Sequence, residues 1–385
     1  MSSVYTTTAV SRQSSAKDAS RELQQSLMGL DISCVVFFCS AQYNLVELGD
    51  ALRRDFGSVP VFGCTSAGEI TPQGYEQKSI IAIGFSSAHF SISASLVNSL
   101  AEFSMADAQS TLSTLNEATS CEQQTQGNSR FILTLLDGLS VAEERFLNTL
   151  HLAAGDMKLF GGSAGDDVNL AKTHVYYDGA FHQQSAIVLM VNTRCQVKVF
   201  STNHILRAQE KLVVTKADSS TRTIFELNAE PAALEYARLL NLSVDQLTPE
   251  IFSLNPLAVK VGGEYYFRSI QKVNELDNSL TFYCAVDTGI VLTAIELGNV
   301  FSNLTHTLDK LETQYGKADM VLACDCFLRR LEIEQKGLVE QANQLFKRHN
   351  IIGFNTYGEQ INGVHLNQTF TGVYIAGAPN DHGAD

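Results

Sequence analysis

The sequence predicts an α/β fold with mixed sheets in two domains. Short continuous apolar runs, such as residues 35–40 and 131–136, are typical of strands covered on both faces. Amphipathic stretches with helical spacing follow these runs. The same order of segments recurs three times, which indicates duplicated sheet architecture. The chain has 385 residues, which is more than one hydrophobic core usually organises, so two domains are expected.

Each repeat is predicted to contain a strand, a helix, a second strand, an elbow of small residues and a return strand. In the first repeat the two strands and the return strand are predicted at 35–40, 61–66 and 80–85. In the second repeat they are predicted at 131–137, 159–163 and 186–191, and in the third at 320–325, 351–356 and 370–376. In the third repeat one long helix is expected to run to about His349. Helical crossovers predict parallel pairing of the first two strands, and the short link to the return strand predicts antiparallel pairing.

The best domain boundary in the sequence is residues 242–256. This stretch contains Pro249 and Pro256, and prolines interrupt regular structure. We therefore predict one domain over residues 20–240 and a second over 250–380. The second domain is expected to contain a hairpin formed by 260–268 and 280–286.

The charge balance argues against several partners. The chain has 27 basic and 41 acidic side chains, a net charge of −14, and no basic cluster. Such a surface repels nucleic acid and anionic lipid. No apolar run reaches the length of a membrane helix and no secretory signal is recognisable, so a cytoplasmic protein is expected.

Residues 161–165 match the G-x-S-x-G pattern of a serine hydrolase, with Ser163 as the nucleophile. That elbow requires a helix directly after it, because the helix supplies part of the oxyanion site. Here residues 173–177 alternate like a strand instead. Ser163 is therefore better explained as one of three similar turns, and no enzyme activity is predicted.

The three elbows end in Glu69, Asp166 and Glu359. Glycines leave backbone N–H groups uncovered there, and the carboxylates could accept from an ammonium or hydroxyl group of a ligand. In the alternative, glycine supplies a positive φ and the carboxylate caps neighbouring amides. The elbows contain no lysine of the Walker type, so a phosphate loop is excluded.

Four histidines are expected in domain interiors or clefts, where a neutral imidazole could bind a metal centre: His174, His182, His204 and His365. A lone histidine in such a place is more often a hydrogen-bonded core residue. Cys324 and Cys326 would point to one face of a strand, but they could bind a metal only with further ligands nearby.

Several long segments resemble the FIST family, over roughly residues 30–378. The segments similar to the C-terminal FIST domain are 255–270, 280–284, 326–332, 353–360 and 365–372. The segments similar to the N-terminal FIST domain are 62–69 and 160–166. The resemblance implies a bacterial sensory module that binds a small ligand and reports to a histidine kinase or a cyclic-di-GMP enzyme. The resemblance is also compatible with a homo-oligomer.

One segment resembles the haem-binding, nitric-oxide-responsive FIST proteins, the NosP group. Many FIST proteins have a Gly-x-x-Pro-x-Gly-like turn after the strand at 197–201, whereas this chain has residues 202–207 without it. The resemblance implies haem b with His204 as proximal ligand, or His365 in its place, and nitric oxide on the opposite side of the iron. The competing hypothesis is an amino-acid sensor without haem, with Glu69, Asp166, Glu359 and Asn367 as ligand-binding residues.

Overall fold

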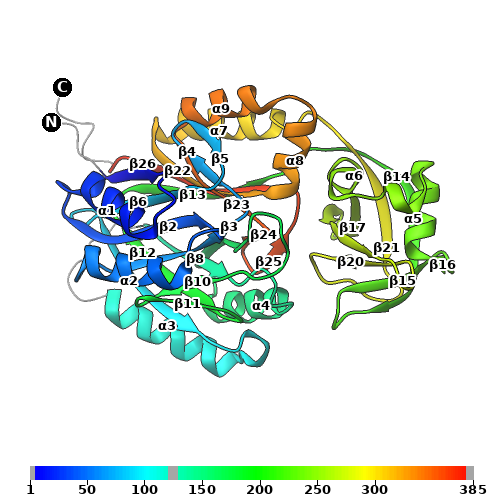
Figure 1. The fold of residues 1–385 in the computed structure, drawn as a ribbon, viewed down its shortest axis with the longest axis horizontal. Coiled ribbons are helices and arrows are strands. Elements are labelled where there is room, and N and C mark those ends of the chain that lie inside the picture. Colours follow the sequence, from blue (N-terminus) through cyan, green and yellow to red (C-terminus); the bar gives the residue numbers. More distant parts are fainter. Residues whose placement is uncertain (1–4, 120–128, 379–385) are drawn as a thin grey trace.

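The computed structural model describes residues 5–119 and 129–378, which form a large body and a smaller lobe (Figure 1). Within these residues there are three six-stranded sheets and one eight-stranded sheet. The mixed α/β fold predicted from the sequence is confirmed. No helix of the described residues is long and apolar enough to cross a membrane.

The three predicted repeats form the body. The first comprises β2 (Ile32–Ser40), α2 (Leu45–Phe56), β3 (Val61–Ser66), β4 (Glu69–Thr71), β5 (Gly74–Glu76) and β6 (Ile80–Ser86). The second comprises β8 (Ser129–Leu136), α4 (Glu143–Ala154), β9 (Lys158–Ser163), β10 (Val175–Tyr177), β11 (Ala180–His182) and β12 (Ala186–Thr193). The third comprises β22 (Ala318–Cys326), α8 (Phe327–Gln335), α9 (Val339–Arg348), β23 (Ile351–Thr356), β24 (Gly358–Ile361), β25 (Val364–Leu366) and β26 (Phe370–Ala376).

Strand pairing follows the same rule in each repeat. The first two strands are parallel, and the return strand is antiparallel to the first, as predicted. The outer edge of each return strand pairs with one further strand: β1 (Thr6–Ser11), β7 (Phe90–Val97) and β13 (Gln196–Thr202). The single long helix expected in the third repeat is wrong: α8 and α9 are separate, and Gly337 lies between them with a φ of 67°.

The short hairpins after the elbows connect the repeats. Hairpin β4–β5 pairs with β23 of the third repeat, β10–β11 pairs with β3 of the first, and β24–β25 pairs with β9 of the second. Each sheet therefore contains a hairpin from another repeat, and the exchange closes into a ring of three. The three sheets cannot separate without breaking these strand pairs.

Side chains from all three sheets share one apolar core. Phe38, Leu133 and Phe354 belong to this cluster, and the rings of Phe38 and Phe354 stack with centroids 4.1 Å apart. Helices cover the outer faces, each through its own apolar stripe: α1 (Ala16–Leu27) with α2, α3 (Met105–Thr119) with α4, and α7 (Ser302–Tyr315) with α9. Strands covered on both faces explain the continuous apolar runs in the sequence.

The lobe is built from residues between β13 and α7. Its strands are β14 (Ile205–Asp218), β15 (Thr223–Leu227), β16 (Glu230–Pro231), β17 (Leu257–Val261), β18 (Glu264–Arg268), β19 (Ile270–Asn274), β20 (Ser279–Phe282) and β21 (Val291–Leu297), and its helices are α5 (Ala232–Leu240) and α6 (Pro249–Leu254). The lobe also contains one short 3₁₀ helix, η2 (Val244–Gln246), and the body contains another, η1 (Leu100–Glu102), between β7 and α3. The lobe has a core of its own around Leu212, Tyr236 and Leu292.

The sheet of the lobe joins strands from both sides of residues 242–256. β14 pairs with β21, and β15 pairs with β20. The predicted boundary therefore lies inside this group of strands, and β13 belongs spatially to the third repeat. The prediction of a hairpin formed by 260–268 and 280–286 is wrong, because β17 pairs with β18 and β19 pairs with β20.

Candidate functional site

The three elbows meet at the carboxyl ends of the parallel strand pairs. The amide of Ala67 donates to Asn355 O (2.9 Å), that of Gly165 to Thr65 O (3.1 Å), and that of Tyr357 to Ser163 O (3.2 Å). These bonds run from the first repeat to the third, from the second to the first and from the third to the second. The three amides are thus used between repeats, and they leave no backbone cradle for a ligand carboxylate at these positions.

Glu69 is fully buried behind the first elbow. Its carboxyl accepts hydrogen bonds from the hydroxyls of Ser66 (2.5 Å) and Ser79 (2.7 Å), and from the Ser79 amide at 3.3 Å. Burial raises the pKa of Glu69 to about 8, against the lowering effect of these hydrogen bonds. The side chain links its own elbow to the start of the return strand β6.

Glu359 occupies the equivalent place in the third repeat. It accepts from the hydroxyls of Thr356 (2.5 Å) and Thr369 (2.8 Å), and burial raises its pKa to about 8. The serines of the first repeat are thus replaced by threonines in the same geometry. In this structure both Glu69 and Glu359 are directed at their own strand ends, and neither faces a cleft.

Asp166 has a different environment in the second repeat. Its carboxylate accepts from the backbone amides of Leu170, Ala171 and Lys172 at 2.7–2.8 Å, and from the Tyr357 hydroxyl. A carboxylate that binds several successive amides stabilises a turn. Asp166 therefore caps neighbouring amides, which is the alternative to ligand binding that its sequence context predicts.

Ser163 lies at the end of β9, and irregular chain follows it until β10. Its hydroxyl is fully buried and accepts a hydrogen bond from Gln360 Nε2 at 3.1 Å. A nucleophile elbow needs an exposed hydroxyl in front of a helix. The geometry around Ser163 lacks both features.

The His204 imidazole is buried, and both of its ring nitrogens have polar partners. Nε2 lies 2.7 Å from Glu332 Oε2, and Nδ1 lies 3.2 Å from Arg329 Nη1. Arg329 is itself bonded to Asp325 at 2.8 Å. Burial lowers the pKa of His204, so a neutral ring is favoured, with Nε2–H donating to the carboxylate and Nδ1 accepting from Arg329. With both nitrogens engaged, His204 does not fit an iron ligand in this structure.

His365 does not fit one either. Its Nδ1 lies 3.2 Å from Glu144 Oε1, and its Nε2 makes no hydrogen bond within the described residues. That nitrogen faces the backbone of Gly358, where an added Cβ would lie only 1.8 Å away. The space in front of Nε2 is therefore filled by protein, and a porphyrin has no room there.

The remaining metal-ligand candidates are scattered. His174 and His182 are each partly buried, and His182 Nε2 lies 3.4 Å from Tyr177 O. Cys324 and Cys326 are buried, and burial raises the pKa of both thiols, so thiolates are disfavoured. None of these four lies in a group of metal-ligating side chains within the described part of the chain.

The junction between body and lobe is held by Arg222, a residue of the lobe. Its guanidinium donates to Glu143 (2.6 Å), to Glu144, and to Tyr283 O at 2.7 Å. Burial by itself lowers the pKa of Arg222, but the carboxylates of Glu143 and Glu144 raise it by more, so the pKa lies above its ordinary value. Burial likewise opposes ionisation of Glu144, but His365 and Arg222 hold the pKa of Glu144 below its ordinary value. Arg222 also has a φ of 52°, which is strained for a non-glycine residue.

Apolar and polar contacts extend this junction. The ring of Tyr283, from the lobe, packs on Phe327 and Tyr357 of the body at centroid distances of 5.4 and 5.9 Å. Gln368 Nε2 of the body donates to Ser253 O of the lobe at 2.7 Å. The lobe therefore covers the end of the body where the elbows meet.

Several buried polar atoms at this junction have no hydrogen-bond partner in the described structure. They are Glu143 Oε1, Ser269 Oγ, Asn367 Oδ1 and Gln368 Oε1, in addition to His365 Nε2, which faces Gly358. Buried polar groups are nearly always paired, so the four atoms other than His365 Nε2 indicate missing waters, ions or ligands. A cleft of about 480 Å³ lies at the same junction, lined by Leu139 of the body and by Arg222, Lys272 and Tyr283 of the lobe among others.

Comparison with known protein families assigns nearly the whole chain. The FIST N domain matches residues 33–230 and the FIST C domain matches 232–362. The chain belongs to the FIST family. It is a FIST sensory and signalling protein, and a search of curated proteins finds no significant match.

The two FIST matches meet inside the lobe, between β16 and α5. Both FIST domains therefore contribute to the junction: Arg222 and Glu143 come from the first, and Tyr283 and Tyr357 from the second. Sequence reasoning missed Arg222 and Tyr283 as site residues. Arg222 lies 61–79 residues from its partners, so no local spacing could mark it.

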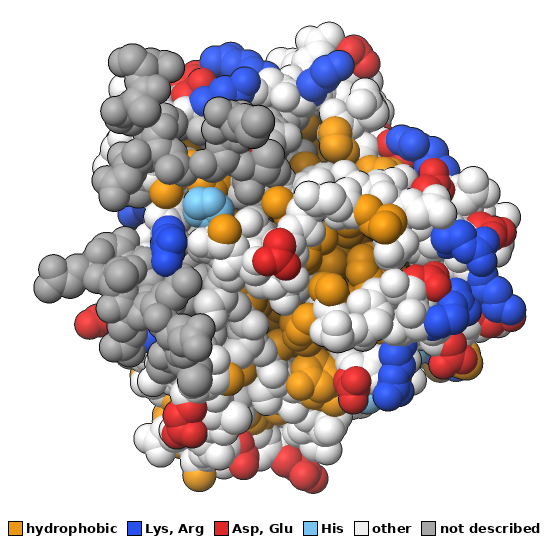
Figure 2. Space-filling view, turned by 90° about the vertical axis from the view of Figure 1, so that its left-hand side faces the viewer, with side chains coloured by type: hydrophobic (Ala, Val, Ile, Leu, Met, Phe, Trp, Pro, Cys, Tyr) orange, Lys and Arg blue, Asp and Glu red, His pale blue; other side chains and the backbone are white. Residues whose placement is uncertain are grey.

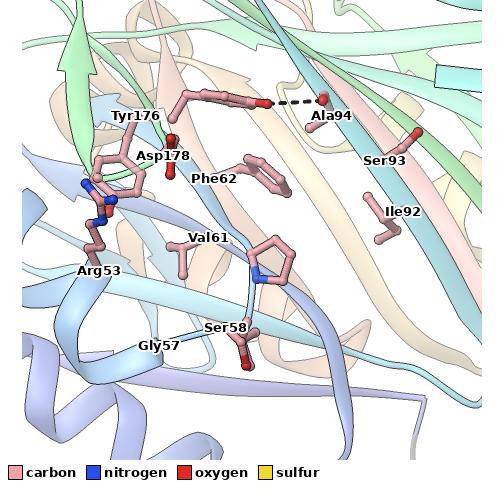
Figure 3. Close-up of a pocket in the computed structure, with 14 residues that line it drawn as sticks. Arg53, Gly57, Ser58, Val61, Phe62, Ile92, Ser93, Ala94, Tyr176 and Asp178 are labelled. Atoms are coloured by element: carbon pink, nitrogen blue, oxygen red, sulfur yellow. Dashed lines mark hydrogen bonds between the residues drawn. The ribbon is translucent and has the colours of Figure 1, made fainter. Parts of the chain in front are cut away.

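A second cavity of about 430 Å³ lies at the amino end of β3, on the side of the FIST body away from the lobe. In Figure 3, Arg53 lies beside Tyr176 on one side of the hollow, and Ile92 and Ser93 lie on the other. Figure 2 shows the end of the body opposite the lobe, where hydrophobic side chains gather in a hollow. The residues that line this cavity include none of the buried polar atoms without a partner.

Proposed function

We propose that the chain senses a small polar molecule at the junction of body and lobe, and that binding changes the position of the lobe. The observation that carries this proposal is that four buried polar atoms at the junction have no hydrogen-bond partner: Glu143 Oε1, Ser269 Oγ, Asn367 Oδ1 and Gln368 Oε1. An interface with unmade hydrogen bonds loses stability, because each unpaired buried group costs about 1–3 kcal/mol. A ligand that pairs them would favour one arrangement of the two parts over another.

The chemistry of these atoms favours an amino acid as the ligand. Glu143 Oε1, Asn367 Oδ1 and Gln368 Oε1 are acceptors, so they suit an ammonium group. Arg222 and Lys272 line the adjoining cleft and suit a carboxylate. These three acceptors are not among the residues that line the cleft, so the ligand would reach them when the lobe moves. This proposal keeps the hypothesis of an amino-acid sensor without haem, but its binding site lies at the junction and not at the elbows.

The family membership supports a signalling output. We propose that the changed lobe position is read by a histidine kinase or a cyclic-di-GMP enzyme, as the FIST resemblance implies. The lobe is attached to the body through two chain crossings, β13 to β14 and β21 to α7, so a rigid movement of the lobe needs no rearrangement of the body sheets.

The test is calorimetric titration of the protein with each of the twenty standard L-amino acids. We expect one or a few to bind, and Asn367→Ala to weaken binding by about 10-fold or more, because a buried acceptor is lost. Gln344→Ala, on the exposed face of α9, is the matched control and should leave the affinity unchanged. Absence of binding by all twenty, or unchanged binding in Asn367→Ala, would contradict the proposal.

Haem b and nitric oxide are tested on the same protein by absorbance. Haem would supply an iron that binds the gas, but His204 and His365 would first have to leave their present partners. After reconstitution with haem, a Soret band that shifts with nitric oxide and is lost in His204→Ala would replace the amino-acid proposal with the haem hypothesis. A colourless protein would leave the junction as the sensory site.

A further inference from the structure

A second group of polar side chains lies far from the junction, on the helices that cover the third repeat. It consists of Asp309 and Glu312 on α7 and His349 at the end of α9. One ligand atom from each residue lies within 4.8 Å of the other two. Asp309 and Glu312 are three residues apart, so their side chains share one face of α7.

The imidazole of His349 is the informative member. Only 2% of its side chain is exposed, and its Nε2 makes no hydrogen bond within the described residues. That nitrogen is directed at the cluster, with Asp309 Oδ1 at 3.8 Å, and Nδ1 lies 3.6 Å from Glu312 Oε2. Both distances are too long for hydrogen bonds, so the ring sits between two carboxylates without a bond to either.

The arrangement leaves one nitrogen of a buried imidazole without a partner beside two carboxylates. A neutral imidazole has one nitrogen with a lone pair, which can bind a metal ion. Buried polar atoms are nearly always paired, and a cation bound between the imidazole and the carboxylates would supply the partner that Nε2 lacks. His349 is the C-cap of α9, and the helix dipole also favours a cation at that end.

We infer that Asp309, Glu312 and His349 form a binding site for a divalent transition metal, with Zn²⁺ as the best fit. Zn²⁺ takes imidazole nitrogen and carboxylate oxygen at about 2.0–2.2 Å, and three protein ligands leave one position for water. Nitrogen and oxygen ligands on one tetrahedral ion lie a little over 3 Å apart, so Asp309 Oδ1, at 3.8 Å from Nε2, needs a small closure. Glu312 now faces Nδ1, and its side chain would have to turn toward an ion on Nε2. Arg348 donates to Asp309 Oδ1 at 2.9 Å and would have to share that oxygen or leave it.

The metal would join α7 to the end of α9. α7 follows the strand β21 that returns from the lobe, so the ion would stiffen the part of the body that carries the lobe. This role is independent of the ligand proposed at the junction. The two sites share no residue, and either one can fail without the other.

The experiment is titration of tag-free, chelator-treated protein with ZnCl₂ by calorimetry. We expect one equivalent to bind, and His349→Ala and Asp309→Asn each to weaken binding by about 10-fold or more. MgCl₂ should not compete, because Mg²⁺ prefers oxygen ligands and keeps its waters. His306→Ala, an exposed histidine on α7, is the matched control and should bind as the wild type does.

Folding of the variants is checked by thermal unfolding in chelator. Asp309 is 46% exposed, so Asp309→Asn should fold even if His349→Ala does not, and it keeps the test decisive. X-ray absorption at the zinc edge should show a first shell of oxygen with one nitrogen. Absence of zinc binding by the wild type, or equal binding by Asp309→Asn, would overturn the inference.

Discussion

Two glutamates, Glu69 and Glu359, combine complete burial with hydroxyl partners at matching positions of two repeats. Their carboxyl groups are held by the side chains at the start of the return strands. Since burial raises the pKa of both to about 8, the folded protein keeps them protonated at a pH where the unfolded chain has already released the protons. These residues therefore connect the elbow geometry to the pH dependence of stability.

We expect the free energy of unfolding to fall as the pH rises from about 4.5 to about 8. In this pH range the unfolded state binds fewer protons than the folded state. The stabilisation is therefore complete below the pKa of the carboxyl groups in the unfolded chain, and it is lost as the pH approaches their pKa in the folded protein. Each pKa unit corresponds to about 1.4 kcal/mol, so the loss is on the order of a few kcal/mol. Glu69→Gln cannot ionise and should lose less stability over this range in urea denaturation.

Glu275→Gln is the control for that measurement, because Glu275 is exposed in the lobe. It should follow the wild type at every pH. If Glu69→Gln also follows the wild type, burial does not raise the pKa of Glu69 in the way described.

The second strand of each repeat has a glycine at one equivalent position: Gly63 in β3, Gly161 in β9 and Gly353 in β23. An added Cβ at each would lie 1.9–2.4 Å from a carbonyl oxygen of the first strand. No side chain fits there without displacing the backbone. Close approach of the two parallel strands thus explains why glycine occurs at this place in all three repeats.

Gly353→Ala should destabilise the protein by about 3 kcal/mol or more, because its Cβ would meet Ala323 O at 1.9 Å. The midpoint of urea denaturation measures the loss. At Gly298 the nearest atom to an added Cβ is 3.4 Å away, so Gly298→Ala should cost far less. A similar small change in both variants would show that the strands can separate to admit a methyl group.

The lobe is attached to the body by a few groups at its own edge. Arg222 reaches Glu143 and Glu144, and the Ala285 amide donates to Glu144 at 2.7 Å. Arg222→Ala would leave Glu143, which is almost completely buried, without its cation. Breaking a buried ion pair by removing one partner costs about 3–5 kcal/mol, so we expect the junction to open locally.

Hydrogen exchange measures that opening. The segment that contains the Ala285 amide should exchange faster in Arg222→Ala, while segments of the body core such as β22 keep their wild-type rate. Arg238→Ala removes an exposed lobe arginine that pairs with Glu210 and Glu235, and it should leave Ala285 protected. Unchanged protection of Ala285 in Arg222→Ala would mean that other contacts hold the lobe.

The amino-acid sequence by itself determined the fold class, the three repeats and the direction of strand pairing within each. These properties depend on local apolar runs and short connections, so they can be predicted from neighbouring residues. Tertiary structure alone decided the exchange of hairpins, the insertion of the lobe and the junction site. Hairpin β4–β5 pairs with β23 across more than half the chain, and Arg222 finds its partners in another part of the fold. Such contacts depend on how the sheets pack around their common core, which no local pattern records.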